Sequence, residues 1–239
     1  MLSFLTLLLA ASTCVHEVVA QYGPIPQETG CDVSRVKIKL PANQTQLVAP
    51  AEGPSFIGLA IGVQNYTCTA ATSTWTNVGA VAELFDVSCL AASGLSDFSD
   101  LTQSVFQSWQ AVPPTVTILE IIDTLAPFHL QGFLGQHFFV PSPSGTGLSP
   151  EWNFASASLA GHPNAFVIGA KVGDIPSPNG PPAIDWLMLN NATATGVLAR
   201  QIFRINTVNG DAPASCTPGE ADISVKYSST YWFYGSAFH

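Results

Sequence analysis

The chain has 239 residues, of which 47% are hydrophobic and only 10% are charged, and its net charge is −9 at pH 7. Because an acidic chain is repelled by phosphate groups, this balance argues against nucleic acid or anionic lipid as a partner and favours neutral ligands. The apolar and aromatic content also argues against intrinsic disorder, since such a chain buries enough surface to offset its conformational entropy.

The first residues have the pattern of a secretory signal peptide. Met1 to Val15 is an almost unbroken apolar run that is too short to span a bilayer, and the small residues ending at Ala20 match a signal-peptidase site. We therefore expect a signal peptide over residues 1–20 and a single secreted β-rich domain over residues 21–239. No later run is long and apolar enough to anchor in a membrane.

Segments rich in Val, Ile, Thr and aromatic residues recur between clusters of Gly, Pro, Asn and Ser, which is typical of a mainly β protein. The predicted strands are 35–40, 56–68, 78–89, 133–140, 165–172, 183–189, 197–206 and 223–234. Helical spacing of apolar residues predicts a helix over 97–110, whereas 117–125 fits a helix or a strand equally well. The stretches 141–150 and 176–182 are predicted surface loops. We expect one β-sandwich or barrel-like domain with one or two short helices.

The last predicted strand carries aromatic residues on both faces. Alternation places Tyr227, Tyr231 and Phe233 on one face. Trp232 and Tyr234 fall on the other. This pattern suggests a strand that is buried on both sides.

Four cysteines remain after the signal peptide, and in an oxidising compartment they are expected to form two disulfides. Cys68 and Cys89 lie on neighbouring strand-like segments, whereas Cys31 and Cys216 lie near the two ends of the domain. Of the three possible pairings we favour Cys68 with Cys89 and Cys31 with Cys216, the second tying the ends together. The Cys and His spacing does not match a metal site, and no metal or other cofactor is predicted.

N-glycosylation sequons begin at Asn43, Asn65 and Asn191, and they mark surface positions in a secreted protein. Strand alternation places Gln64 and Tyr66 on the face opposite Asn65. Cys68 falls on the same face as Gln64 and Tyr66, which agrees with a buried disulfide opposite an exposed glycan.

Several catalytic signatures are missing, including a G-x-G-x-x-G turn, a P-loop and G-x-S-x-G. His137 at the start of an aromatic strand and Asp185 within an apolar one are the candidate catalytic residues. A structural role is the more common outcome for both, and for Asp185 it would be an ion pair with Arg200 or Arg204. Further acid–base candidates are Glu83 and Asp86.

Several motifs follow one another across the chain. They are Gly62-Val-Gln-Asn-Tyr-Thr-Cys68, Ala82-Glu-Leu-Phe-Asp86, Gly135-Gln-His-Phe-Phe139 with the following Pro/Ser loop and Trp152, Ile184-Asp-Trp-Leu-Met-Leu189, Arg204-Ile-Asn-Thr-Val-Asn-Gly-Asp-Ala-Pro-Ala-Ser-Cys216 and Tyr231-Trp-Phe-Tyr234. In content and order they resemble a family of secreted fungal and bacterial proteins catalogued only as a domain of unknown function. The resemblance implies secretion and a fold, but no activity. Fungal members often carry the label malate dehydrogenase, which we reject because the nucleotide fold and the Gly-rich phosphate turn of NAD-dependent dehydrogenases are absent.

Secretion, low charge, sequons and aromatic-rich strands lead to the hypothesis of a non-enzymatic extracellular or cell-wall-associated domain that binds a neutral glycan or wall polymer. Its candidate ligand-binding residues are Gln64, Tyr66, Trp152 and Trp232. The alternative is an extracellular enzyme acting on polysaccharide or on a small secreted metabolite. A structural or host-interacting role without a small-molecule site also fits the sequence.

Overall fold

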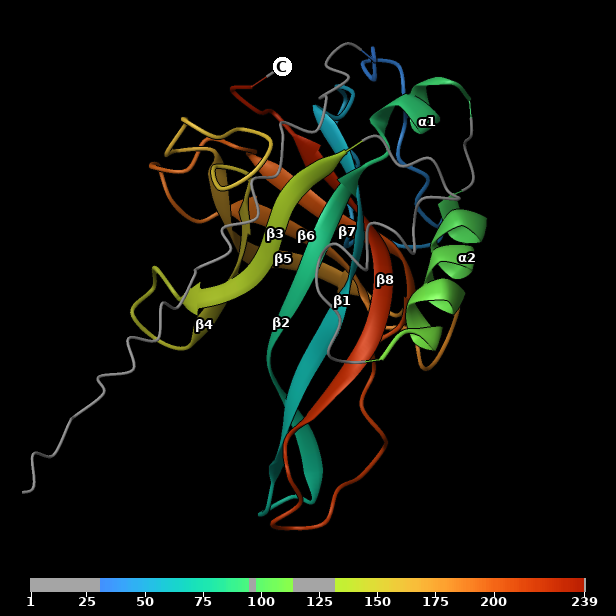
Figure 1. Cartoon of the computed structure of the whole chain (residues 1–239), viewed down its shortest axis with the longest axis vertical. Coiled ribbons are helices and arrows are strands. Elements are labelled where there is room, and N and C mark those ends of the chain that lie inside the picture. Colours follow the sequence, from blue (N-terminus) through green and yellow to red (C-terminus); the bar gives the residue numbers. More distant parts are fainter. Residues whose placement is uncertain (1–30, 95–97, 114–131, 239) are drawn as a thin grey trace, which may run out of the picture.

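The computed structural model describes residues 31–94, 98–113 and 132–238. Within them eight strands form one closed barrel, each antiparallel to the next along the chain, with the last strand closing against the first (Figure 1). The strands are β1 (Phe56–Thr69), β2 (Thr74–Asp86), β3 (Phe133–Pro141), β4 (Leu148–Asn153), β5 (Phe166–Ile175), β6 (Trp186–Asn191), β7 (Gln201–Asn209) and β8 (Ile223–Tyr234). The helices α1 (Ser88–Ala92) and α2 (Phe98–Ala111) lie between β2 and β3 in the chain.

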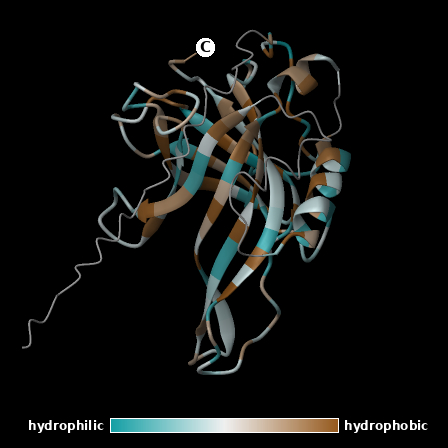
Figure 2. Ribbon diagram, viewed as in Figure 1, coloured by the Kyte–Doolittle hydropathy of each residue, from teal (hydrophilic) through white to brown (hydrophobic). Residues whose placement is uncertain are grey.

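The prediction of a mainly β, barrel-like domain with short helices is confirmed, whereas the sandwich alternative is not. Closure gives every strand two partners, although β2 pairs with β3 only over 82–85, so the β1–β2 hairpin extends beyond the closed part of the ladder. Figure 2 shows apolar and polar residues mixed along the strands, as expected where one face of a strand packs and the other meets solvent. In the described part of the chain, no helix is long and apolar enough to cross a membrane.

Most predicted elements are found, and two predictions are wrong. The helix predicted over 97–110 is α2, and the strand predicted over 223–234 is β8. Residues 35–40 form no strand, because their apolar side chains pack on the outside of the barrel without joining its ladder. β4 begins inside 141–150, a stretch predicted to be a loop. The prediction is wrong because Pro and Ser residues are typical of loops, and here they accompany a short strand. The predicted signal peptide and the ambiguous stretch 117–125 lie outside the described residues.

β8 is buried on both faces, as its aromatic residues predict. Its inward side chains belong to the core inside the barrel, and these include Tyr227, Tyr231 and Phe233. Its outward side chains belong to a second core between the barrel wall and α2, and these include Trp232 and Tyr234. There Trp232 meets Phe98 of α2 edge-on, with 5.8 Å between ring centroids. β8 therefore separates the core inside the barrel from the core beneath α2.

Polar contacts also fix α2 against the wall. Trp109 Nε1 donates to the carbonyl of Gly62 on β1 at 3.1 Å. Lys226 Nζ, on β8, lies 4.3 Å from the centre of the Trp109 ring and donates to the carbonyls of Trp109 and Val112. A lysine at the C-terminal end of a helix bonds to its free carbonyls and interacts favourably with the helix dipole. Lys226 therefore stabilises this end of α2 and also holds the helix against β8.

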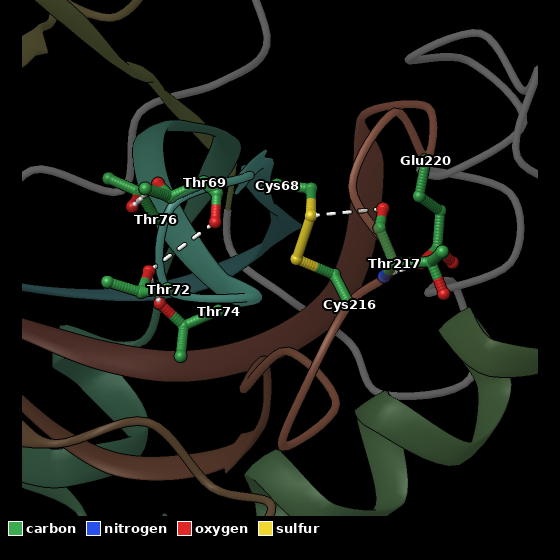
Figure 3. Close-up of a disulfide and its surroundings, with 8 residues drawn as sticks. All are labelled: Cys68, Thr69, Thr72, Thr74, Thr76, Cys216, Thr217 and Glu220. Atoms are coloured by element: carbon green, nitrogen blue, oxygen red, sulfur yellow. Dashed lines mark hydrogen bonds between the residues drawn. A yellow bond between two sulfur atoms is a disulfide. The ribbon is translucent and has the colours of Figure 1, made fainter.

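The disulfides pair differently from the prediction. Cys31 bonds to Cys89 and Cys68 bonds to Cys216, with Cα separations of 5.0 and 5.9 Å. The β1–β2 hairpin explains the error, since its register places Cys68 near the turn, opposite Trp75, while Cys89 follows the far end of β2. Figure 3 shows the Cys68–Cys216 bond joining this end of the hairpin to the loop that leads into β8.

Candidate functional site

The two ends of the barrel interior differ in character. One end is closed by aromatic rings, where Phe154 meets Phe56 at 6.0 Å and Phe233 at 5.3 Å between centroids. At the other end the inward positions carry polar groups, among them Gln64 on β1 and Arg204 on β7. A candidate site therefore lies toward this polar end.

His137 of β3 occupies the middle of the interior. It lies opposite Trp152 of β4 in the ladder, and the two rings stack 4.6 Å apart with 13° between their planes. Tyr231 of β8 packs at an angle against both, at 5.5 Å and 5.2 Å. Gly169 on β5 makes room for the indole, because a Cβ there would lie 3.0 Å from its Cζ3 atom. His137 and Trp152 are only 2% and 1% exposed.

The protonation state of His137 follows from its surroundings. Its Nδ1 lies 2.9 Å from the carbonyl oxygen of Glu151, which can only accept, so Nδ1 carries the proton and Nε2 offers a lone pair. Burial lowers the pKa of His137 to about 3, and the positive charge of Arg204 acts in the same direction. The imidazole is therefore neutral near pH 7. Its Nε2 takes part in no hydrogen bond between described residues, and it does not belong to the fully buried atoms that lack a partner.

Other polar atoms at inward positions also lack partners among the described residues. They are Nε2 of Gln64, Nε1 of Trp152 and Oγ of Ser229, whose residues are 4%, 1% and 0% exposed. The amide oxygen of Gln64 accepts from Asn77 Nδ2 at 3.0 Å, and Gln64 also lies close enough to the Tyr227 hydroxyl to act on the pKa of that group. An unpaired buried polar group costs about 1–3 kcal/mol, so such groups normally meet a protein partner, water or a ligand. Their occurrence together inside one barrel makes this the candidate binding site.

The rim at the polar end is fixed by contacts to main-chain carbonyls. Arg204 donates through Nε and Nη2 to the carbonyl of Asp185 at 3.1 and 2.9 Å. Tyr66 donates its hydroxyl to the carbonyl of Gly210 at 2.8 Å. Burial and the neighbouring Asp185 raise the pKa of Asp211, and the charge of Arg204 partly offsets this. The Arg204 guanidinium therefore lies at the rim, with the carboxyls of Asp185 and Asp211 in its neighbourhood.

The ligand-binding candidates from the sequence divide into two groups. Gln64, Tyr66 and Trp152 occupy inward positions, together with His137. Trp232 does not join them, because it faces outward beneath α2 and is 3% exposed. Neither tryptophan presents an open face on the surface.

The acid–base candidates are not gathered around His137. Ala82 is the residue opposite His137, so the next residue, Glu83, points outward, where Gln136 donates to it at 3.0 Å. Asp86 accepts from the backbone N–H of Ser88 at 2.8 Å, at the start of α1. Burial raises the pKa of Glu83 and of Asp86. The Glu83 carboxyl is thus held on the other side of the barrel wall, and that of Asp86 lies at the end of β2 beside α1.

Asp185 lies exposed at the rim rather than within a strand. The ion pair predicted for it does not form, because Arg204 binds its main-chain carbonyl and not its carboxylate. Arg200 instead pairs with Glu52 at 2.9 Å. No three His, Cys, Asp or Glu residues of the described ranges gather closely enough to hold a metal ion.

Sequence reasoning missed Ser229. Alternation on β8 places it between Tyr227 and Tyr231 on the inward face, so a lone serine among inward aromatic residues was the available signal. Alternation does not show whether the Ser229 hydroxyl has a hydrogen-bond partner, because the strands that surround it are distant in sequence.

The sequons differ in accessibility. Asn43 is exposed, whereas Asn65 and Asn191 are half-buried. The side-chain nitrogen of Asn191, to which a glycan would attach, donates to the carbonyl of Gly196 at 2.7 Å. Glycosylation itself remains a prediction, with Asn43 as the most accessible acceptor.

Lowering the pH from 6.5 to 5 is expected to remove about 2 kcal/mol from the free energy of unfolding through His137 alone. The unfolded histidine takes up a proton near pH 6.5, whereas the folded one, with its pKa of about 3, does so only at much lower pH. The unfolded state therefore binds more protons in this window, and stability falls by about 1.4 kcal/mol per pH unit as the pH decreases. Urea unfolding at several pH values measures the effect.

The comparison that isolates this effect is between wild type and His137→Phe, with the exposed His162→Phe as a matched control. His137→Phe should flatten the profile and His162→Phe should not. The raised pKa values of Glu83 and Asp86 act in the opposite sense in all three proteins. An unchanged profile in His137→Phe would contradict the prediction.

The comparisons with known proteins bear on the family and not on an activity. No curated protein and no solved structure matches the chain, so no relative supports the malate dehydrogenase label. The antiparallel barrel also differs from the parallel sheet on which dinucleotide-binding folds are built. The family described as "Protein of unknown function (DUF3455)" matches residues 49–235, which include all eight strands of the barrel. The match confirms the resemblance seen in the motifs, and the chain belongs to this family of unknown function.

Proposed function

We propose that this protein is an extracellular binding domain that takes a small, neutral, hydroxyl-bearing ligand into the polar end of its barrel. The observation that carries the proposal is that polar atoms of Gln64, Trp152 and Ser229, at inward positions of the barrel, have no hydrogen-bond partner among the described residues. An eight-stranded barrel is wide enough to be filled by side chains or to hold one small ligand. The two disulfides are compatible with an oxidising extracellular compartment.

The neutrality of the ligand is argued from the groups that would surround it. His137 is neutral, and burial raises the pKa of Tyr227 well above its ordinary value, so neither ring supplies a charge near pH 7. A buried ammonium group would lose its hydration without gaining a counter-ion beside these rings, and a carboxylate would find only Arg204, which is already bonded to the carbonyl of Asp185 at the rim. A hydroxyl group, by contrast, both donates and accepts hydrogen bonds.

A neutral glycan unit belongs to this ligand class, in keeping with the hypothesis from the sequence. The burial of Trp152 and Trp232 argues against side-on stacking of a long polymer on these two rings. A single small unit that enters the barrel is therefore the form of the proposal that the geometry supports best.

The test is isothermal titration calorimetry of the folded protein against neutral monosaccharides and small alcohols. Ser229→Ala should weaken binding about five- to tenfold, because it removes an inward hydroxyl that no described residue uses. Ser104→Ala, at an exposed position on α2, is the matched control and should leave binding unchanged. If no neutral hydroxyl compound binds, or if both variants behave alike, the proposal is wrong.

A further inference from the structure

The polar end of the barrel has one apolar side. Leu148, Pro150 and Trp152 alternate onto the same face of β4, and Phe139 of β3 lies opposite Pro150. Leu148 is 54% exposed, whereas Trp152 is 1% exposed. Apolar side chains therefore follow this face of β4 from the exposed Leu148 to the buried Trp152.

The rings at the inner end form an aromatic wall. His137 contacts Trp152, Tyr231 and Phe139, and its ring centroid lies 5.7 Å from that of Phe139. Flat aromatic guests pack well against such rings, stacked or edge-on. The wall therefore favours a planar ring over a flexible chain.

The unpartnered atoms beside this wall have complementary needs. Nε2 of His137 requires a donor, whereas Nε2 of Gln64 and Nε1 of Trp152 require acceptors. A single hydroxyl group supplies one donor and two lone pairs at one place. A sugar would bring further hydroxyls against the apolar lining, and a hydrocarbon would leave every polar atom unpaired.

We propose, on the basis of the proposed function, that the ligand is a small phenol or aromatic alcohol. Its hydroxyl donates to Nε2 of His137 and accepts from Gln64 or Ser229, and its ring lies against the aromatic wall with its far edge toward Leu148. The neutral imidazole suits a phenol, which is itself neutral at pH 7 because a phenolic hydroxyl ionises near pH 10.

The test is calorimetry at pH 7 with 4-methylphenol, with 4-methylanisole, which has the same ring but no O–H donor, and with glucose. Wild type should bind 4-methylphenol at least about tenfold more tightly than 4-methylanisole, since the ether leaves Nε2 of His137 without a donor. In His137→Phe this ratio should approach one. If that variant does not fold, Ser229→Ala is used, and it should weaken binding of the phenol more than that of the ether.

The outcomes separate the two proposals. Equal binding of the phenol and the ether, or binding of glucose in preference to both, would overturn the aromatic hydroxyl ligand while leaving a neutral binding domain in place. If the protein binds neither these compounds nor any other neutral hydroxyl compound, both proposals are overturned.

Discussion

Replacement of Trp152 by alanine is expected to lower the free energy of unfolding by about 3–5 kcal/mol, the usual range for removing a buried aromatic side chain. The indole is 1% exposed and contacts rings from β3 and β8, including Phe233 at 6.3 Å between centroids. A closed barrel relaxes little around such a gap, because each strand is held by two neighbours. Urea unfolding monitored by far-UV circular dichroism measures the loss.

A graded series makes this prediction sharper. Trp152→Phe keeps an aromatic ring beside His137 and should lose clearly less stability than Trp152→Ala. Val81→Ala, at an outward position that is 48% exposed, is the control and should change stability by less than about 0.5 kcal/mol. A loss below about 1 kcal/mol in Trp152→Ala would show that the barrel interior is not packed around this ring.

The mainly β fold could be predicted because alternation and turn residues are local signals. β8 illustrates this, since its aromatic residues indicated two buried faces and the structure has an apolar core on each side. Closure of the barrel could not be predicted in the same way. It depends on pairs such as Phe56 with Phe233, whose separation in the chain leaves no local trace.

Part of the candidate site was also accessible from the sequence. His137 was singled out at the start of an aromatic strand and Trp152 as a candidate ligand-binding residue, and the register places them opposite each other. Glu83 was a further acid–base candidate, but one step along β2 separates the inside of the barrel from the outside. Nearness in sequence is thus a poor guide to which groups share a site in a barrel.

The Cys68–Cys216 disulfide is expected to contribute about 4–5 kcal/mol to stability, as judged from a double variant in which both residues are alanine. The bond spans 148 residues, and within that loop lie all of β2 to β7. Closing so long a loop in the unfolded chain removes much of its conformational entropy. The bond also holds β8 near β1, the pair that closes the barrel.

The Cys31–Cys89 bond provides the matched comparison, because it spans only 58 residues and ties the N-terminal segment to α1 outside the barrel. Urea unfolding of the Cys31→Ala, Cys89→Ala double variant should show a smaller loss, since the closed loop is shorter and the barrel ladder is untouched. Non-reducing peptide mapping of the wild type first establishes which cysteines are joined. A peptide linking Cys68 to Cys89 would contradict the pairing itself. Equal stability of wild type and the Cys68→Ala, Cys216→Ala variant would show that barrel closure does not depend on this bond.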